Sequence, residues 1–143
     1  MKRILVTGAS GFIGSFLVEK GVEKGFSVWA GMRASSSKKY LPTEGVDYIS
    51  LDYSSPEKLR AQLLAFKEKH GAWDYIIHAA GLTKCVDKKD FFRVNYEGTA
   101  NFLSALDALG MHPCKFIYLS SLSVYGPVRE KMPYVPIKDS DTP

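Results

Sequence analysis

Three evenly spaced glycines form the motif of this sequence that most clearly predicts a chemical role. Gly8, Gly11 and Gly14 are separated by two residues each and lie between an apolar run and a segment of helical period. A turn from a strand into a helix directs free backbone N–H groups and the positive end of the helix dipole at whatever lies above it. Glycines allow a tight bend there and a close approach of phosphate oxygens to the backbone. The motif therefore predicts a phosphate-binding turn, and the plainer alternative is a turn without a ligand.

The elements that would position this turn alternate along the chain. Short runs rich in valine and isoleucine predict five strands, at Ile4–Thr7, Ser27–Met32, Tyr48–Leu51, Tyr75–His78 and Phe116–Leu119. Segments of helical period predict three helices, at Phe12–Lys24, Pro56–Lys69 and Asp90–Leu109. Strands joined through helices imply right-handed parallel crossovers. We therefore expect an α/β fold with a doubly wound parallel sheet of five strands in three layers, and a polar loop from Ser35 to Gly45.

The apolar residues of each helix predict the side that faces the sheet. In the first helix these are Phe12, Ile13, Phe16, Leu17 and Val22. The second helix begins with a capping Ser55 and with Pro56 at its first position, and its inward residues are Leu59, Leu63 and Phe66. The third helix is apolar on more than one side, at Phe91, Phe92, Val94, Phe102, Leu103 and Leu106. It is therefore expected to be buried by the sheet on one side and by a partner on another.

Composition and charge limit the class of protein. The 143 residues are 45% hydrophobic and 24% charged, which is typical of one globular domain with a real core. A net charge of +4 is expected to lie on a solvated surface, so no nucleic-acid partner is predicted. The two cysteines, Cys85 and Cys114, lack metal-ligand spacing, so we predict no metal site and a reducing, cytoplasmic location. No signal peptide or membrane span is expected, because no apolar run is long enough.

Four further motifs follow the glycine turn, at strand ends and in the long helix. They are Asp52 after the third strand, His78-Ala79-Ala80-Gly81 after the fourth, Asn95-Tyr96-Glu97-Gly98-Thr99 in the helix, and the segment 119–126 after the fifth strand. In this order, the five motifs resemble the extended branch of the short-chain dehydrogenase/reductase family, which contains epimerases, dehydratases and reductases. The resemblance implies a Rossmann-like NAD(P)-binding domain over residues 1–126. Residues 127–143 would form a loop that leads toward the catalytic helix.

The resemblance also implies which residues hold the cofactor. Its pyrophosphate would lie on the glycine turn, with the contributing residues Gly8, Ser10, Gly11, Phe12, Ile13 and Gly14. Asp52 and Tyr53 would meet the adenine, although a surface-loop or helix-capping carboxylate is an alternative for Asp52. Small residues let the backbone approach a ribose, and they are Ala79, Ala80 and Gly81. Asn95 would steady the neighbouring strand or an active-site water, or serve only as a buried polar anchor.

The segment after the second strand predicts which cofactor is used. An NAD site normally places a carboxylate on the ribose hydroxyls about 20 residues after the glycine turn. No acidic residue occurs between Glu23 and Glu44, and the second strand ends in Gly31, Met32 and Arg33. The Arg33 guanidinium is suited to clamp a 2′-phosphate, as in the NADP-using reductases that this segment resembles. We therefore expect NADP rather than NAD, and the plainer alternative is a basic surface loop.

The family chemistry requires a serine, a tyrosine and a lysine. By resemblance, Ser121 would hydrogen-bond the substrate oxygen that loses a proton, with Ser123 as a second candidate. The tyrosine needs a lysine four residues later on one helix face, because the ammonium stabilises the phenolate. Tyr134 and Lys138 have this spacing, but Pro136 between them opposes a helix. We reject this pair and expect the true pair beyond residue 143.

Two classes of function remain open at this point. In the first, the chain is the cofactor-binding part of an enzyme that moves a hydride between a nicotinamide and a hydroxyl or carbonyl carbon, and it is inactive by itself. The enzyme would act on a small-molecule substrate that the sequence does not identify, and it would form a homodimer through the helix over residues 90–109. In the second, the chain is a complete dinucleotide-binding or sensor module without catalysis.

Overall fold

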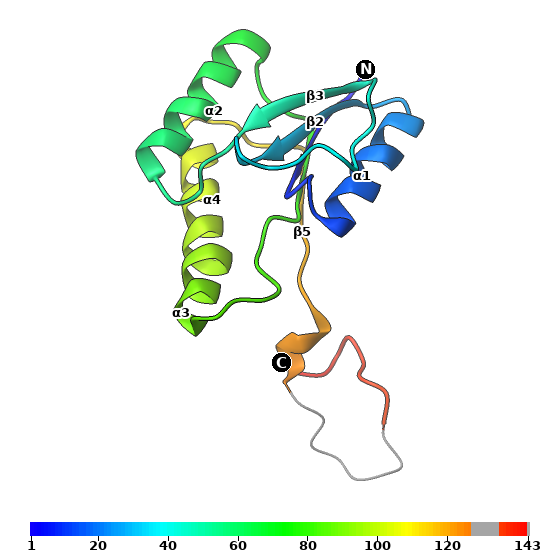
Figure 1. Ribbon diagram of the computed structural model, residues 1–143, viewed down its shortest axis with the longest axis vertical. Helices are drawn as coiled ribbons and strands as arrows, with labels where there is room; N and C mark the ends of the chain where they lie inside the picture. The colour runs from blue at the N-terminus through cyan, green and yellow to red at the C-terminus, as the bar shows by residue number, and fades with distance from the viewer. Residues whose placement is uncertain (127–134, 143) are drawn as a thin grey trace.

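The fold is built on one parallel sheet of five strands. The computed structural model describes residues 1–126 and 135–142. The strands β1 to β5 have the spatial order β3-β2-β1-β4-β5 and span Arg3–Thr7, Ser27–Met32, Val46–Ser50, Tyr75–His78 and Lys115–Tyr118 (Figure 1). The chain moves outward from β1 to β3 and then crosses to the other side of β1 for β4 and β5. The reversal of strand order therefore lies between β1 and β4, which is where doubly wound sheets bind ligands.

Helices cover both faces of the sheet and complete three layers. One face is covered by α1 (Phe12–Glu23), and the other by α2 (Pro56–His70) and by α4 (Gly98–Ala108). The helix α4 continues the short α3 (Lys88–Phe91) and the six π-helical residues of η1 (Phe92–Glu97), and a 3₁₀ turn, η2 (Leu122–Tyr125), follows β5. The predicted three-layer α/β fold is confirmed.

The third strand begins and ends earlier than the sequence predicted. It spans Val46–Ser50 instead of Tyr48–Leu51, since Val46 pairs with Val28 of β2. The strand is an edge strand, so its limits are set by backbone pairing with β2 and not by the apolar run. Leu51 keeps one ladder contact, a hydrogen bond of 3.0 Å from its N–H to the carbonyl oxygen of Met32.

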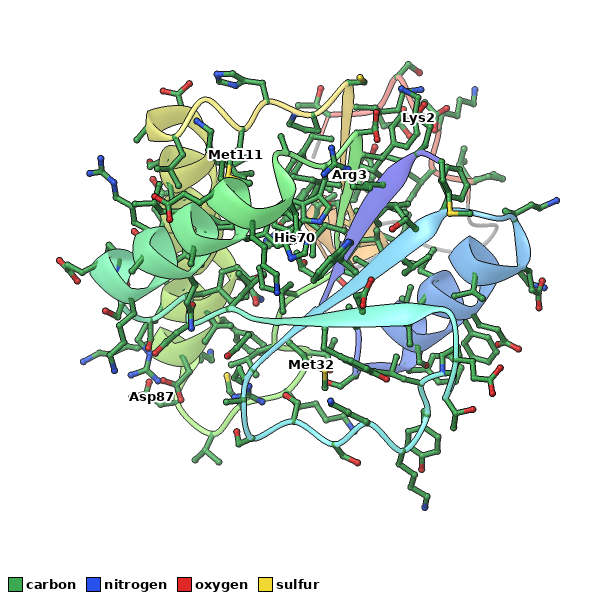
Figure 2. All side chains as sticks on the ribbon, turned by 90° about the horizontal axis from the view of Figure 1, so that it is seen from above. Lys2, Arg3, Met32, His70, Asp87 and Met111 are labelled. Atoms are coloured by element: carbon green, nitrogen blue, oxygen red, sulfur yellow. The ribbon has the colours of Figure 1, made fainter. Side chains whose placement is uncertain are left out.

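Each layer of helices encloses its own apolar core. The core under α1 contains the buried residues Ile4, Val6, Ala9, Val18, Val28, Ala30, Met32 and Leu41. The larger core under α2 and α4 contains Leu5, Ile49, Leu51, Leu59, Leu63, Phe66, Trp73, Ile76, Phe102, Ala105, Leu106, Leu109 and Met111. At the end of α2, the ring of His70 packs against Trp29 and Phe66, between the helix and the sheet (Figure 2). The central strand β1 contributes to both cores, as expected for an apolar strand without polar alternation.

The first helix packs on the sheet largely through small residues, which corrects part of the predicted face: Leu17 and Val22 pack against the core as predicted, whereas the other three residues do not. Phe12 is 81% exposed, and Ile13 and Phe16 are also exposed. The buried residues of α1 are Gly14, Ser15, Val18 and Gly21. A Cβ at Gly14 would lie 2.1 Å from the carbonyl oxygen of Gly8 in the turn, and one at Gly21 would lie 2.9 Å from the Val28 side chain of β2, so at both places the helix approaches too closely for a side chain.

The second helix follows its prediction closely. The Ser55 hydroxyl accepts the N–H of Lys58 at 3.3 Å, and Pro56 occupies the first helical position. Its buried residues are the predicted Leu59, Leu63 and Phe66. Capping by a hydroxyl and a proline at the first position act locally, which is why the sequence alone located this helix start.

The long third helix is present but is not uniformly α-helical. The run over residues 88–108 replaces the single helix predicted at Asp90–Leu109, because its middle six residues are wound more widely. Phe102, Ala105 and Leu106 face the sheet, whereas Phe92 and Leu103 are exposed. The sequence predicted that this helix is apolar on a second side as well, and the structure has exposed apolar residues on that outer side.

Candidate functional site

The carboxyl ends of the strands bring the predicted site residues to one edge of the sheet. The register pairs Thr7 of β1 with Gly31 of β2 on one side and with His78 of β4 on the other. The predicted residues follow directly: the glycine turn after β1, Asp52 after β3, Ala79 after β4 and Ser121 after β5. This edge includes the reversal of strand order between β1 and β4.

The first glycine of the turn is required by its conformation and by its neighbours. Gly8 has φ of +64°, a value that residues with a side chain rarely adopt. A Cβ at Gly8 would lie 2.6 Å from the carbonyl oxygen of Ala79, so the turn packs directly on the loop after β4. Ala9, the next residue, connects the turn to β2, because its N–H donates to the Gly31 carbonyl oxygen at 3.3 Å.

The start of α1 is uncapped and open. The first helical hydrogen bond runs from the Ser15 N–H to the Gly11 carbonyl oxygen at 2.9 Å, so the three preceding N–H groups have no partner within the helix. No side chain caps the helix, and its first turn contains no acidic residue. Gly11, Phe12 and Ile13 are exposed, and a Cβ at Gly11 would approach only the Gly8 carbonyl oxygen, at 3.2 Å. This arrangement fits an anion bound to backbone N–H groups.

The loop after β4 is held at both ends by side chains from elsewhere in the fold. The Thr7 hydroxyl oxygen accepts the N–H groups of Ala79 at 3.1 Å and Ala80 at 3.2 Å. At the other end, the Asn95 Oδ1 accepts the Leu82 N–H at 2.7 Å, and the Asn95 amide donates to the Leu82 carbonyl oxygen at 3.0 Å. Asn95 is therefore a polar anchor of the loop. The sequence did not indicate that Thr7 would hold this loop, although Thr7 lies immediately before the glycine turn.

The buried imidazole of His78 lies beneath this loop. Its Nδ1 is 2.8 Å from the Thr7 hydroxyl, and its Nε2 is 3.1 Å from the Thr99 hydroxyl. Burial lowers the pKa of His78 from 6.5 to about 4, so the ring is neutral at neutral pH. The sequence motif contained His78, but nothing in it showed that the ring would join β1 to α4.

Tyr53 faces inward. Its ring packs edge-on against His78, with centroids 5.8 Å apart, and against Phe102 at 5.6 Å. Its hydroxyl is buried beside Thr7 and makes no hydrogen bond of acceptable geometry within the described residues. Burial raises the pKa of Tyr53 well above its usual value. The predicted contact between Tyr53 and adenine stays a prediction.

The Asp52 carboxylate is engaged in its own loop. Its Oδ1 accepts the Ser54 hydroxyl at 2.6 Å and the Ser54 N–H at 3.1 Å. These hydrogen bonds to Ser54 lower the pKa of Asp52. The geometry matches the surface-loop alternative for Asp52, and its contact with adenine stays a prediction.

Arg33 is exposed immediately after β2. The buried Met32 is the last residue of that strand, and Arg33 begins a turn in which its carbonyl oxygen accepts the Ser36 N–H at 2.9 Å. Among the ion pairs of the described residues, none involves Arg33. The nearby Lys38 ammonium lies over the Tyr48 ring, 3.7 Å from its centroid. The guanidinium is therefore available to an anionic ligand.

Ser121 begins the 3₁₀ turn after β5. Its hydroxyl donates to the Ser123 hydroxyl at 3.0 Å and accepts the Ser123 N–H at 3.2 Å. Of the rejected pair, Tyr134 lies outside the described residues, and Lys138 is in a described stretch without a helix. Within residues 1–126 and 135–142, no group of side chains could hold a metal ion, and no helix is long and apolar enough to cross a membrane.

The sequence profile of the NAD dependent epimerase/dehydratase family matches residues 4–143. The chain belongs to this family. It is 30% identical over 145 residues to a UDP-glucose 4-epimerase of Klebsiella pneumoniae, covering 93% of this chain and 98% of that sequence. A putative dihydroflavonol 4-reductase of Synechocystis is 30% identical over 121 residues, which cover 85% of this chain but 33% of the relative. Family membership thus confirms the resemblance to epimerases and reductases.

Solved structures of family members have the same fold. A UDP-glucose 4-epimerase superposes with a TM-score of 0.73 at 25% identity, covering 89% of this chain and 38% of that one. The Bordetella bronchiseptica enzyme WbmG, in complex with NAD and UDP, superposes with a TM-score of 0.73 at 25% identity over 99% of this chain and 43% of its own. The chain thus spans about two fifths of the length of these two proteins.

Proposed function

We propose that this chain binds a nicotinamide dinucleotide across the carboxyl ends of β1 and β4, as the cofactor-binding part of an epimerase, dehydratase or reductase. The observation that carries the proposal is the open, uncapped start of α1 beside the Gly8 turn, at the reversal of strand order. When bound, the nicotinamide exchanges a hydride with a hydroxyl or carbonyl carbon of a small-molecule substrate. The domain that binds it would span residues 1–126.

Most of the predicted residues line the proposed site. The pyrophosphate accepts hydrogen bonds from the first turn of α1, with Gly8, Ser10, Gly11, Phe12, Ile13 and Gly14 around it. Ala79, Ala80 and Gly81 lie below the riboses, where their small size admits the sugar. Ser121 follows β5 and would donate a hydrogen bond to the substrate oxygen. Its hydroxyl is exposed and bonded only to Ser123 within the described residues, so it can turn toward a substrate.

Substitution of a single glycine by alanine tests dinucleotide binding separately from stability. A Gly11→Ala methyl group would occupy the open space above the helix start, so we expect the Kd for NADP to rise about tenfold or more. The matched control is Gly25→Ala at the other end of α1, where φ is +76° and no atom lies within 4 Å. Each variant should lose about 1 kcal/mol of stability, but only Gly11→Ala should lose affinity. Equal affinities in titrations of both variants would contradict the proposed site.

The exposed Arg33 supports a preference for NADP over NAD. Because Arg33 forms no ion pair within the described residues, a 2′-phosphate would gain a charge-assisted hydrogen bond without displacing a partner. Arg33→Gln should weaken NADP binding about tenfold to a hundredfold and leave NAD binding unchanged. Arg60→Gln on α2 removes the same charge from an exposed position and is the control. Tighter binding of NAD than of NADP by the unmodified chain would overturn the preference.

The outer side of the long helix supports a homodimer. Phe92 and Tyr96 are exposed and stack with their ring centroids 4.7 Å apart, and Leu103 continues the apolar side. An exposed aromatic pair on a helix is typical of a protein–protein contact. We expect Tyr96→Glu to shift sedimentation toward the monomer, whereas a single species of unchanged mass would argue against this interface.

A cytoplasmic location belongs to the same proposal. Cys85 and Cys114 are not joined by a disulfide bond in the structure. Free thiols persist in reducing compartments, which supports this location.

A further inference from the structure

We propose that His78 is a positioning residue that fixes the loop Ala79–Leu82 by setting the direction of the Thr7 hydroxyl hydrogen. The inference deepens the proposed function, because this loop is the floor of the proposed cofactor site. It rests on a chain of hydrogen bonds that joins β1, β4 and the long helix beneath the loop. One backbone carbonyl oxygen, which can only accept, determines which group donates and which accepts in every bond of this series.

The chain of hydrogen bonds begins at the backbone carbonyl oxygen of Asn95. The Thr99 hydroxyl lies 2.8 Å from the Asn95 carbonyl oxygen, which can only accept, so Thr99 donates its hydrogen there. The Thr99 oxygen is then an acceptor for the His78 Nε2, 3.1 Å away. The hydrogen of the neutral imidazole is therefore on Nε2.

The tautomer of His78 determines what Thr7 can do. With its hydrogen on Nε2, the ring offers the Nδ1 lone pair to the Thr7 hydroxyl at 2.8 Å. Thr7 donates its hydrogen to the ring and keeps both oxygen lone pairs for the N–H groups of Ala79 and Ala80. In the other tautomer, the Nδ1 hydrogen would occupy one Thr7 lone pair, and the N–H groups of Ala79 and Ala80 would compete for the other. The loop would then lose one of its anchors.

The surroundings of the imidazole favour this arrangement. Four aromatic rings lie around it, from Tyr53, Phe102, Phe116 and Tyr118, and none of these contacts introduces a charged group. Burial keeps the pKa of His78 near 4, so the ring stays neutral and retains one acceptor nitrogen at neutral pH. The chain of bonds leaves Thr7 no capacity for the Tyr53 hydroxyl beside it, which makes no hydrogen bond of acceptable geometry among residues 1–126 and 135–142.

The tautomer can be measured without any ligand. Long-range ¹H–¹⁵N correlation spectra of the 143-residue chain distinguish a protonated from an unprotonated ring nitrogen. We expect His78 to show a protonated Nε2 and an unprotonated Nδ1, unchanged between about pH 8 and pH 5. His70 and His112 lie outside the chain of bonds and serve as internal comparisons. A protonated Nδ1 in His78, or a ring that becomes charged near pH 6.5, would overturn the proposal.

The effect on the site is tested at Thr99, which lies on the far side of the ring from the loop. Thr99→Val keeps the shape and removes the hydroxyl, so we expect a mixture of His78 tautomers and a Kd for NADP raised about fivefold. Thr99→Ser restores the hydroxyl and should keep both the tautomer and the affinity. Thr43→Val, at an exposed threonine in the loop before β3, should change neither.

The outcomes separate this inference from the proposed function. A Thr99→Val protein with wild-type affinity would show that His78 does not position the loop. If Thr99→Val does not fold, the comparison of Thr99→Ser with the unmodified chain and the spectrum of His78 still decide the proposal. If the unmodified chain binds neither NADP nor NAD, the proposed function fails, whereas the spectrum continues to test the direction of the bonds.

Discussion

Replacement of Tyr53 by phenylalanine is expected to stabilise the protein. The Tyr53 hydroxyl is buried beside Thr7 without a hydrogen bond of acceptable geometry within the described residues. An unpaired buried hydroxyl costs about 1–3 kcal/mol, and phenylalanine would keep the ring contacts with His78 and Phe102. Because Tyr53 as a whole is only partly buried, the low end of this range applies. We expect Tyr53→Phe to raise the free energy of unfolding by about 1 kcal/mol.

Urea unfolding followed by tryptophan fluorescence measures this change. Trp73 lies in the larger core and Trp29 packs against it, so both report on loss of tertiary structure. For a chain of this size, m is about 2 kcal/mol/M, and the midpoint should rise by about 0.5 M. Tyr40→Phe is the control, because Tyr40 is 71% exposed. A lower midpoint for Tyr53→Phe would refute the reasoning, since it would show that the hydroxyl makes a stabilising hydrogen bond and that Thr7 has capacity to spare.

Three further predictions concern stability without any bound cofactor. Gly14→Ala would place a Cβ 2.1 Å from the Gly8 carbonyl oxygen, so it should lower the free energy of unfolding by more than about 2 kcal/mol in the same urea assay. Hydrogen bonding to Lys2 lowers the pKa of Asp74, so Asp74→Asn should destabilise at neutral pH, and the difference should disappear as the pH falls below about 4 in unfolding curves recorded against pH. Lys67→Met removes a hydrogen bond to the carbonyl oxygen of Leu109 at the C-terminal end of α4. It should lower the free energy of unfolding by about 0.5–1 kcal/mol, which is measured as a lower thermal midpoint.

Most of the fold followed from local sequence patterns. The apolar run of β1 and the hydroxyl cap of α2 are both marked by residues adjacent in the sequence, and the structure has a buried β1 and a helix that starts at this cap. The limits of β3 did not follow, because an edge strand ends where its partner stops pairing. The π-helical turn in the long helix was not predicted either, since no periodic pattern marks it.

The packing face of α1 shows where periodicity misleads. Phe12 and Phe16 have the spacing of a buried helical face, yet both are exposed and pack edge to face on each other with centroids 5.2 Å apart. The helix instead lies close to the turn and the sheet at its glycines, since a Cβ at Gly14 would meet the Gly8 backbone and one at Gly21 would lie 2.9 Å from the Val28 side chain of β2. A hydrophobic pattern cannot show this, because the distance between a helix and a sheet is decided by the smallest residues between them.

The sequence by itself determined the parallel α/β fold, the glycine turn at its central strand and the family to which the chain belongs. These depend on residue types at fixed short spacings, which the chain carries in its order. Only the tertiary structure decided that Tyr53 turns inward and that His78 links two strands to the long helix. Thr7 and His78 are 71 residues apart in sequence, and their hydrogen bond exists because parallel pairing in register brings the ends of β1 and β4 together.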